Sequence, residues 1–235
     1  MSRAILFDFD GTLAPNLDLP DMRRQVVALT QAFQVPDAVY ADQYIVEVIE
    51  AAAAWLESRD GRSTAEEYRI AAEQKIIDIE LAAAASTEPF AAVPHMLNQL
   101  LAAGHRLGIV TRNCRAAVLQ VFPEVLEHVD VLSARDDTRY LKPDPRHLSE
   151  CLTQLGCLPQ HSVMVGDGHL DMRAGKALNM YCIGVLTGSG NGPSLTEAGA
   201  HHILAQLTPT NLSQHLDYVA FQSPSPEVDE PNVPR

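Results

Sequence analysis

The chain has 235 residues, of which 46% are hydrophobic and 20% are charged, so it can bury one large core or a core with a smaller inserted domain. Its 17 basic and 30 acidic residues give a formal net charge of −13 without any run of Lys or Arg, which argues against the basic surface that a nucleic-acid partner requires. No segment reaches about 18 consecutive apolar residues, so we also expect no membrane-spanning helix.

The first predicted element is a short buried strand over residues 4–9. It is an apolar run rich in Ile, Leu and Phe, and it ends at Asp10-Gly11, a typical turn sequence. From about residue 20 to residue 85 the pattern changes to long helical stretches in which Ala, Glu and Gln dominate. We therefore expect a helical insert directly after the first strand.

Two helices are predicted within this insert. Apolar residues at amphipathic spacing predict the first over 37–59, and Asp60-Gly61 marks its end. Ser63 is followed three residues later by Glu66, which is a capping-box pattern. This pattern predicts that the second helix begins at Ser63.

After Pro89 the sequence alternates between predicted helices and predicted strands, which is typical of a parallel sheet with helices on both faces. The predicted strands are 107–111, 129–133, 162–165 and 181–185. The predicted helices are 94–103, 114–120, 145–155 and 171–178. The fold class is therefore α/β, a Rossmann-like parallel sheet core with an inserted all-helical domain.

These patterns also set the expected domain boundaries. The α/β core takes 1–15 and 90–221, and the helical domain takes 16–89. The stretch 222–235 combines four prolines with acidic residues and is expected to be a disordered tail. The four cysteines form no close metal-binding pair and no secretory signal opens the chain, so we expect reduced thiols and a cytoplasmic location.

Polar residues follow the predicted strands at the edge where open α/β sheets bind ligands. In chain order they are Asp8, Asp10, Thr111, Lys142, Asp167 and Asp171. Asp8 and Asp10 lie two residues apart, so in an extended segment their side chains point the same way. Two carboxylates in one pocket repel unless a cation or a shared proton relieves them, and hard oxygen ligands favour Mg²⁺.

Two interpretations of this carboxylate pair follow from chemistry alone. A carboxylate can act as a nucleophile and form an aspartyl-phosphate, while a second carboxylate serves as general acid and then as general base. In the alternative, Asp8 and Asp10 only cap a turn or a helix.

Four motifs occur in order along the chain and add to this reading. They are Asp8-Phe9-Asp10-Gly11-Thr12-Leu13, then Thr111 at the end of Gly108-Ile109-Val110, then Lys142-Pro143, and finally Gly166-Asp167 with Asp171 four residues later. Together they resemble the haloacid dehalogenase superfamily, in the phosphatase branch that carries a helical cap, with a similarity to phosphoglycolate phosphatases. The resemblance implies that the helical insert is this cap.

The resemblance also implies an activity and a set of roles. The expected activity is Mg²⁺-dependent hydrolysis of a small phosphate monoester, such as phosphoglycolate or a sugar phosphate, by a phosphoric monoester hydrolase. Asp8 would be the nucleophile and Asp10 the general acid and base. The implied phosphate-binding residues are Thr111, Arg112, Asn113 and Lys142. The implied metal-binding residues are Asp8, Asp10 through its carbonyl, Asp167 and Asp171.

Two other functions remain alternatives at this stage. One is a phosphomutase of the β-phosphoglucomutase type, although Ala14 to Pro20 lacks the His that follows the first motif in that group. The other is a non-catalytic binding protein on the same fold, because fold does not determine function. The expected partner is a small phosphorylated metabolite, and the expected state is a monomer or a homodimer.

Two further predictions concern residues outside the four motifs. Arg59 and Arg62 flank Gly61 between the two helices of the insert, and we expect them at the end that faces the core. There, either arginine could reach a second anion on the leaving group of the substrate; the alternative is that both are solvated. His169 is predicted to be a helix-start residue near the site rather than a catalytic group.

Overall fold

A parallel six-stranded sheet forms the centre of the molecule in the computed structural model, which describes residues 3–222, the last six of them by their helical backbone alone. The strand order is β3-β2-β1-β4-β5-β6, and every neighbouring pair is parallel. The strands are β1 (Ala4–Phe7), β2 (Arg106–Val110), β3 (Val131–Ser133), β4 (Val163–Gly166), β5 (Tyr181–Val185) and β6 (His202–Leu204). This order is that of a Rossmann-like doubly wound fold, which confirms the predicted class.

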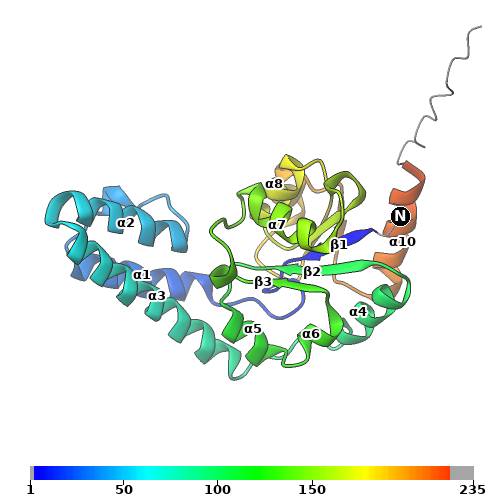
Figure 1. Ribbon diagram of the computed structural model, residues 1–235, viewed down its shortest axis with the longest axis horizontal. Helices are drawn as coiled ribbons and strands as arrows, with labels where there is room; N and C mark the ends of the chain where they lie inside the picture. The colour runs from blue at the N-terminus through cyan, green and yellow to red at the C-terminus, as the bar shows by residue number, and fades with distance from the viewer. Residues whose placement is uncertain (1–2, 223–235) are drawn as a thin grey trace, which may run out of the picture.

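Helices cover both faces of the sheet, as Figure 1 shows. Ile5 and Phe7 of β1 pack on one side, against α4 (Val93–Ala102), α5 (Arg115–Val121), α6 (Val125–His128) and α10 (Pro209–Gln222). Ala4 and Leu6 pack on the other side, against α7 (Pro145–Leu155), α8 (His169–Ala177) and α9 (Gly192–Ala198). Because strand side chains alternate between faces, each strand contributes to two hydrophobic clusters.

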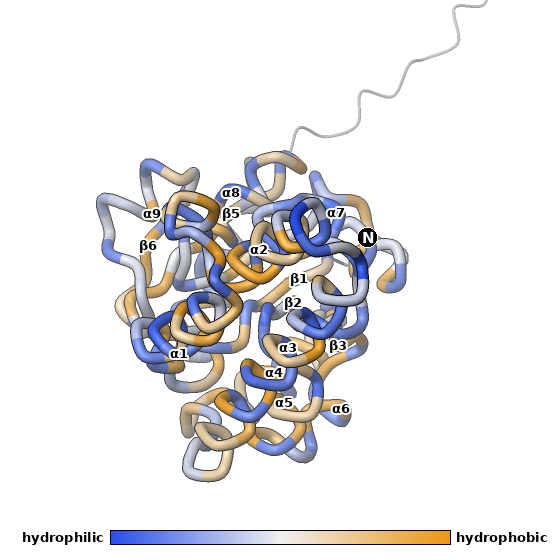
Figure 2. The backbone as a smooth tube through the Cα atoms, turned by 90° about the vertical axis from the view of Figure 1, so that its left-hand side faces the viewer, coloured by the Kyte–Doolittle hydropathy of each residue, from blue (hydrophilic) through white to orange (hydrophobic). Residues whose placement is uncertain are grey.

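The helical insert lies between β1 and α4 in the sequence and consists of α1 (Leu19–Ala32), α2 (Ile45–Asp60) and α3 (Arg62–Ala84). Its helices bury a hydrophobic cluster of their own, which includes Met22, Leu56 and Tyr68. The Tyr68 hydroxyl hydrogen-bonds the Thr30 hydroxyl at 2.8 Å inside this cluster. Figure 2 views the molecule from this side, with α2 and α3 in front of the strands.

The predicted core elements lie within a few residues of those observed, and differences gather in the insert. The predicted helix over 37–59 is in fact a short 3₁₀ helix, Asp37–Val39, followed by α2 from Ile45. The capping box at Ser63 is wrong, because α2 and α3 are joined through Gly61 alone, at φ 92°, and Ser63 already lies inside α3.

Four elements of the core were not predicted, namely α6, which precedes β3, and α9, β6 and α10, which follow β5. Gln222 is the last residue of α10, so the tail predicted over 222–235 otherwise lies outside the described residues. Two further short 3₁₀ helices, Arg135–Asp137 and Pro159–His161, link elements of the core. Between residues 3 and 222, no helix is long and apolar enough to cross a membrane.

Candidate active site

The neighbouring strands β1 and β4 bring the first and fourth motifs together. Asp8 follows β1 and its backbone N–H donates to the carbonyl of Val165 in β4 at 2.9 Å, while Asp167 follows β4 directly. In this strand order the crevice at the carboxyl ends opens between β1 and β4, where the chain changes direction across the sheet. The fold therefore places both aspartates at the point where an α/β sheet binds its ligand.

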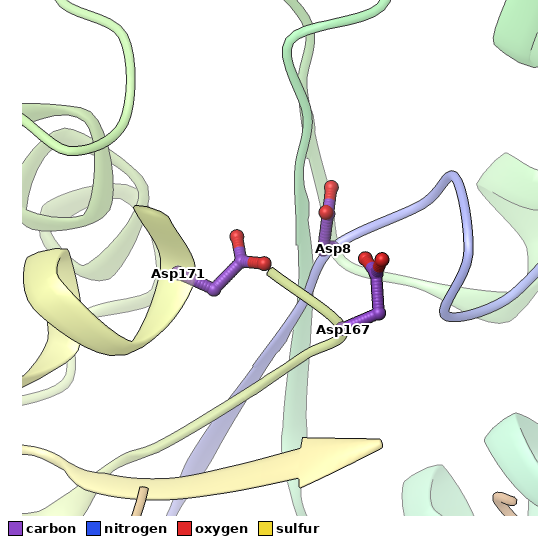
Figure 3. Close-up of side chains that lie close together, drawn as sticks. All are labelled: Asp8, Asp167 and Asp171. Atoms are coloured by element: carbon purple, nitrogen blue, oxygen red, sulfur yellow. The ribbon is translucent and has the colours of Figure 1, made fainter. Parts of the chain in front are cut away.

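Three carboxylates meet at this point. Each of Asp8, Asp167 and Asp171 offers an oxygen, and the three oxygens lie within 4.8 Å of one another. Figure 3 shows the three side chains close together. Asp171 comes from the first turn of α8, where its carboxylate accepts from the backbone N–H of Gly168 at 3.0 Å. Lys142 Nζ lies 2.8 Å from Asp8 Oδ1 and 2.6 Å from Asp171 Oδ1, and its side chain is 1% exposed.

The carboxylate of Asp167 is held by the loop after β5. It accepts from the backbone N–H of Ser189 at 2.6 Å and from the Ser189 hydroxyl at 2.9 Å. A Cβ on Gly188 would lie 2.1 Å from the same carboxylate, and one on Gly11 would lie 2.7 Å from it. Only glycine leaves room there, and Gly11 also has φ 77°. We missed Ser189 from the sequence, although it follows a predicted strand just as Asp167 does.

The second motif approaches Asp10. Asn113 donates its side-chain amide to both carboxylate oxygens of Asp10 at 3.1 Å, and its backbone N–H donates to the Thr111 hydroxyl at 3.0 Å. Thr111 is fully buried, and the Asn113 side-chain carbonyl is buried without a hydrogen-bond partner among the residues described. Because the Thr111 hydroxyl accepts its hydrogen bond from Asn113, its own proton is available to a ligand.

Burial and mutual repulsion change the acidity of these groups. Burial raises the pKa of Asp8 to about 6; Asp171 adds to the rise and Lys142 opposes it. Burial raises the pKa of Asp10 to about 8, with the charge of Asp8 as the next cause. Burial also raises the pKa of Asp167 and of Asp171. Burial lowers the pKa of Lys142, but the charges of Asp171 and Asp8 outweigh this effect, so the pKa of Lys142 is raised.

This carboxylate set fits a hard divalent cation. The three oxygens are close enough to share one ion, while the single ammonium of Lys142 leaves their repulsion only partly offset. Carboxylate oxygens are the ligands that Mg²⁺ prefers, and Mg²⁺ needs only one or two of them beside water and substrate oxygens. The side chain of Asp10 is not part of this cluster. The predicted contact between the backbone carbonyl of Asp10 and the metal stays a prediction.

The site opens into a cavity of about 800 Å³ between the strand ends and the insert. Asp8, Asp10, Thr111 and Lys142 line the side toward the sheet. Residues of α1, of the loop before α2 and of α3 line the other side. The insert therefore covers the site, as a cap would.

Arg59 and Arg62 do not line this cavity. The prediction that they face the core is wrong: Figure 1 shows the α2–α3 junction at the end of the insert farthest from the sheet. α2 begins beside the core at Ile45, and at about 1.5 Å per residue its 16 residues carry Arg59 more than 20 Å away. Arg59 instead pairs with Asp60 and lies over the Trp55 ring, 4.3 Å from its centroid.

Two ion pairs and several hydrogen bonds join the insert to the core, and none was foreseen. Arg112 donates to both carboxylate oxygens of Glu47 in α2, at 3.1 and 2.7 Å. The Tyr44 hydroxyl hydrogen-bonds His169 Nε2 at 2.7 Å, and His169 is the first residue of α8, as predicted. Arg112 and Asn113 thus have partners other than a ligand in this structure, and their phosphate-binding role stays a prediction.

The second ion pair joins Glu80 of α3 to Arg135. Arg135 donates to both carboxylate oxygens of Glu80, to Oε2 at 2.8 Å, and the backbone N–H of Cys114 also donates to Glu80 at 3.3 Å. Glu80 is 2% exposed. The helical spacing could have identified Glu80 in the sequence. It lies four residues after Ile76 and four before Ala84, on the buried face of α3.

Comparisons with known proteins agree with this geometry. The pattern of the family described as haloacid dehalogenase-like hydrolase matches residues 5–185. Pyrophosphatase PpaX of Bacillus velezensis is 36% identical over 91 residues, which are 38% of this chain and 42% of that relative. The chain thus aligns with only about two fifths of the curated relatives it matches.

Solved structures share the fold over nearly the whole chain. A predicted phosphoglycolate phosphatase from Haemophilus somnus superposes with a TM-score of 0.63 at 16% identity, covering 91% of this chain and 98% of that one. A putative β-phosphoglucomutase from Thermotoga maritima gives 0.58 at 18% identity, covering 92% and 99%. With the family pattern spanning all four motifs and the strand order that carries them, the chain belongs to the haloacid dehalogenase-like hydrolase family.

Proposed function

We propose that the protein is a Mg²⁺-dependent phosphatase that hydrolyses a small phosphate monoester through an aspartyl-phosphate on Asp8. The observation that carries the proposal is the pairing of two carboxyl groups with different tasks at one strand end. Asp8 lies beside Lys142, whose charge favours its ionised, nucleophilic form. Asp10 has a pKa of about 8 and so keeps a proton near neutral pH, as a general acid must.

The binding roles follow from the contacts of the site. Asp8, Asp167 and Asp171 would hold the cation, which when bound offsets negative charge on the phosphoryl oxygens and on these carboxylates. Ser189 and Thr12 fix the orientation of Asp167. The Thr111 hydroxyl and the Lys142 ammonium are placed to donate hydrogen bonds to phosphoryl oxygens, which stabilises the charge of the transferring group.

In the first step an oxygen of Asp8 attacks phosphorus. A bond forms between that oxygen and phosphorus, the bond from phosphorus to the leaving oxygen breaks, and Asp10 gives its proton to the leaving oxygen. The products of this step are an alcohol, an aspartyl-phosphate and an ionised Asp10. Asn113, which donates to both oxygens of Asp10, keeps that carboxyl group oriented in either state.

In the second step water attacks the phosphorus of the aspartyl-phosphate. Asp10 accepts a proton from the water, the bond between phosphorus and the Asp8 oxygen breaks, and inorganic phosphate leaves. Both carboxyl groups then return to their starting states. The helical insert covers the cavity and limits access of bulk water during transfer.

Relatives support this reading at the level of reaction type. The names pyrophosphatase and phosphoglycolate phosphatase, carried by two of them, both describe hydrolysis of a phosphate. A test is release of inorganic phosphate from 4-nitrophenyl phosphate by the full chain, in Mg²⁺ and in EDTA. We expect turnover in Mg²⁺ and its loss in EDTA; equal turnover in both solutions would contradict the proposal.

The phosphomutase alternative can be tested with the same purified protein. A mutase moves a phosphoryl group between two positions of a sugar, whereas a phosphatase releases it as inorganic phosphate. Phosphorus NMR of a reaction with a hexose phosphate distinguishes the isomer from free phosphate. We expect free phosphate to accumulate without an isomeric sugar phosphate.

A further inference from the structure

The cavity wall that would face the leaving group is largely apolar. It is contributed by α1, by the loop that precedes α2 and by the start of α2. Its apolar members include Leu17, Leu19, Met22, Tyr44, Ile45 and Val46. Leu19 and Tyr44 are 38% and 39% exposed, so part of their apolar surface is open on this wall.

Among the described residues, Arg23 is the cation that the insert contributes to this wall, and its guanidinium is hydrogen-bonded to backbone carbonyls. Arg23 of α1 donates to the carbonyls of Tyr40 and Ala41, at 3.4 and 2.9 Å, and to that of Gln43. These bonds tie α1 to the loop before α2. Three hydrogen bonds to these carbonyls thus hold the Arg23 guanidinium against the loop before α2.

The two core arginines on the wall are neutralised by the insert. Arg112 donates to both oxygens of Glu47 and also to the carbonyl of Lys142. Arg135 donates to both oxygens of Glu80 and to the carbonyl of Arg112, at 2.8 Å for the latter. Each guanidinium thus has a bidentate carboxylate partner, the geometry that satisfies arginine best.

The remaining basic groups on the wall are no more available. Lys142 lies between Asp8 and Asp171 at the reaction centre, beyond the leaving group. His169 Nε2 is occupied by its hydrogen bond with the Tyr44 hydroxyl at 2.7 Å. Among the described residues that line the cavity, carboxylates outnumber cations.

We propose that the leaving group of the natural substrate is uncharged and partly apolar, and that Glu47 enforces this preference by occupying Arg112. The inference rests on the proposed phosphatase function and refines its substrate class. A second anion on the leaving group would meet an apolar wall, and it could gain Arg112 only by displacing Glu47. An uncharged group meets neither cost and buries apolar surface against the insert.

This substrate class differs from those in the names of the relatives. Pyrophosphate and phosphoglycolate both carry a second anionic group next to the phosphate that is released. A site for either would be expected to offer a free cation at the distance of that group. Here Arg112, which lines the cavity, is instead paired with Glu47.

The test uses two pairs of substrates that differ by one negative charge and keep their shape. The first pair is phosphoglycolate and its primary amide, and the second is 4-carboxyphenyl phosphate and 4-carbamoylphenyl phosphate. We expect kcat/KM of the full chain in Mg²⁺ to favour the amide by about tenfold or more in each pair. A preference for the carboxylate in both pairs would overturn the inference, whereas no hydrolysis of any of the four would instead refute the phosphatase function.

Two variants assign the preference to Glu47. Glu47→Gln removes the charge that occupies Arg112 and should reduce the preference for the amide by about fivefold or more, mainly through a lower KM for the carboxylate. Glu57→Gln makes the same charge change on the exposed face of α2, away from the cavity, and should leave the preference as it is. Equal ratios in both variants would remove Glu47 from the proposal.

Discussion

Removing divalent cations should destabilise the protein more at about pH 8 than at about pH 5. In the folded chain the pKa of Asp8 is about 6 and that of Asp10 about 8, against an ordinary value of 3.8. Without a cation the folded state therefore binds more protons than the unfolded state across this window, and the free energy of unfolding falls as pH rises. The folded-state pKa of Asp8 lies about one unit above pH 5, so at about 1.36 kcal/mol per pH unit the raised pKa of Asp8 alone accounts for about 1.4 kcal/mol between pH 5 and pH 8.

A cation held by the carboxylates offsets their repulsion and favours their ionised forms, so the stabilisation by Mg²⁺ should grow with pH. For a chain of this length, about 1.4 kcal/mol corresponds to a difference in Tm of about 3–6 °C. Thermal unfolding followed by circular dichroism, in Mg²⁺ and in EDTA at both pH values, measures this difference.

The comparison between the two solutions isolates the carboxylates. His147, whose pKa burial lowers to about 3, contributes equally with and without the cation, so its effect cancels. Asp10→Asn removes the carboxyl group with the higher pKa and should flatten the pH dependence in EDTA. A Tm difference between Mg²⁺ and EDTA that is the same at both pH values would refute the reasoning.

Two further predictions concern one structural and one binding contact. Glu80→Gln should lower the free energy of unfolding, measured in urea, by about 3 kcal/mol, because Arg135 loses a buried counter-ion. The matched change at an exposed residue, Glu66→Gln, should lower it by less than about 0.5 kcal/mol. Equal losses in the two variants would contradict the buried pair. Thr111→Val keeps the side-chain shape without the hydroxyl and should lower kcat about a hundredfold. It should also lower the Tm, because the backbone N–H of Asn113 loses its acceptor, and Thr111→Ser should restore most of both. Unchanged kcat in the valine variant would exclude Thr111 from phosphoryl binding.

Much of the core and its site could be predicted from the sequence, for a physical reason. Apolar runs of strand length that end at polar residues mark the carboxyl edge of a parallel sheet, and the fold gathers those ends in one place. Asp8, Asp167 and Asp171 are predicted correctly as a cluster because they share this edge. Ser189 obeys the same rule after β5, and a stricter reading of strand ends would have included it.

The insert was harder to predict, because its role depends on which end of each helix touches the core. Periodicity indicates the buried face of a helix but not the direction in which the helix runs from the sheet. Arg59 was therefore placed at the wrong end of α2, while Glu47 near its start reaches Arg112. A one-residue link such as Gly61 also hides a helix boundary, since capping patterns assume an extended residue before the helix.

The central claim is that Asp8 becomes phosphorylated during turnover, and trapping that intermediate tests it most directly. The full chain is quenched in acid during hydrolysis of 4-nitrophenyl phosphate, reduced with borohydride, which converts an acyl phosphate to an alcohol, and digested for mass spectrometry. We expect the reduced residue at position 8 alone, and we expect Asp8→Asn to fold normally, lack the signal and keep less than about a tenth of the activity. A trapped phosphate at another residue, or substantial turnover by Asp8→Asn, would contradict the account.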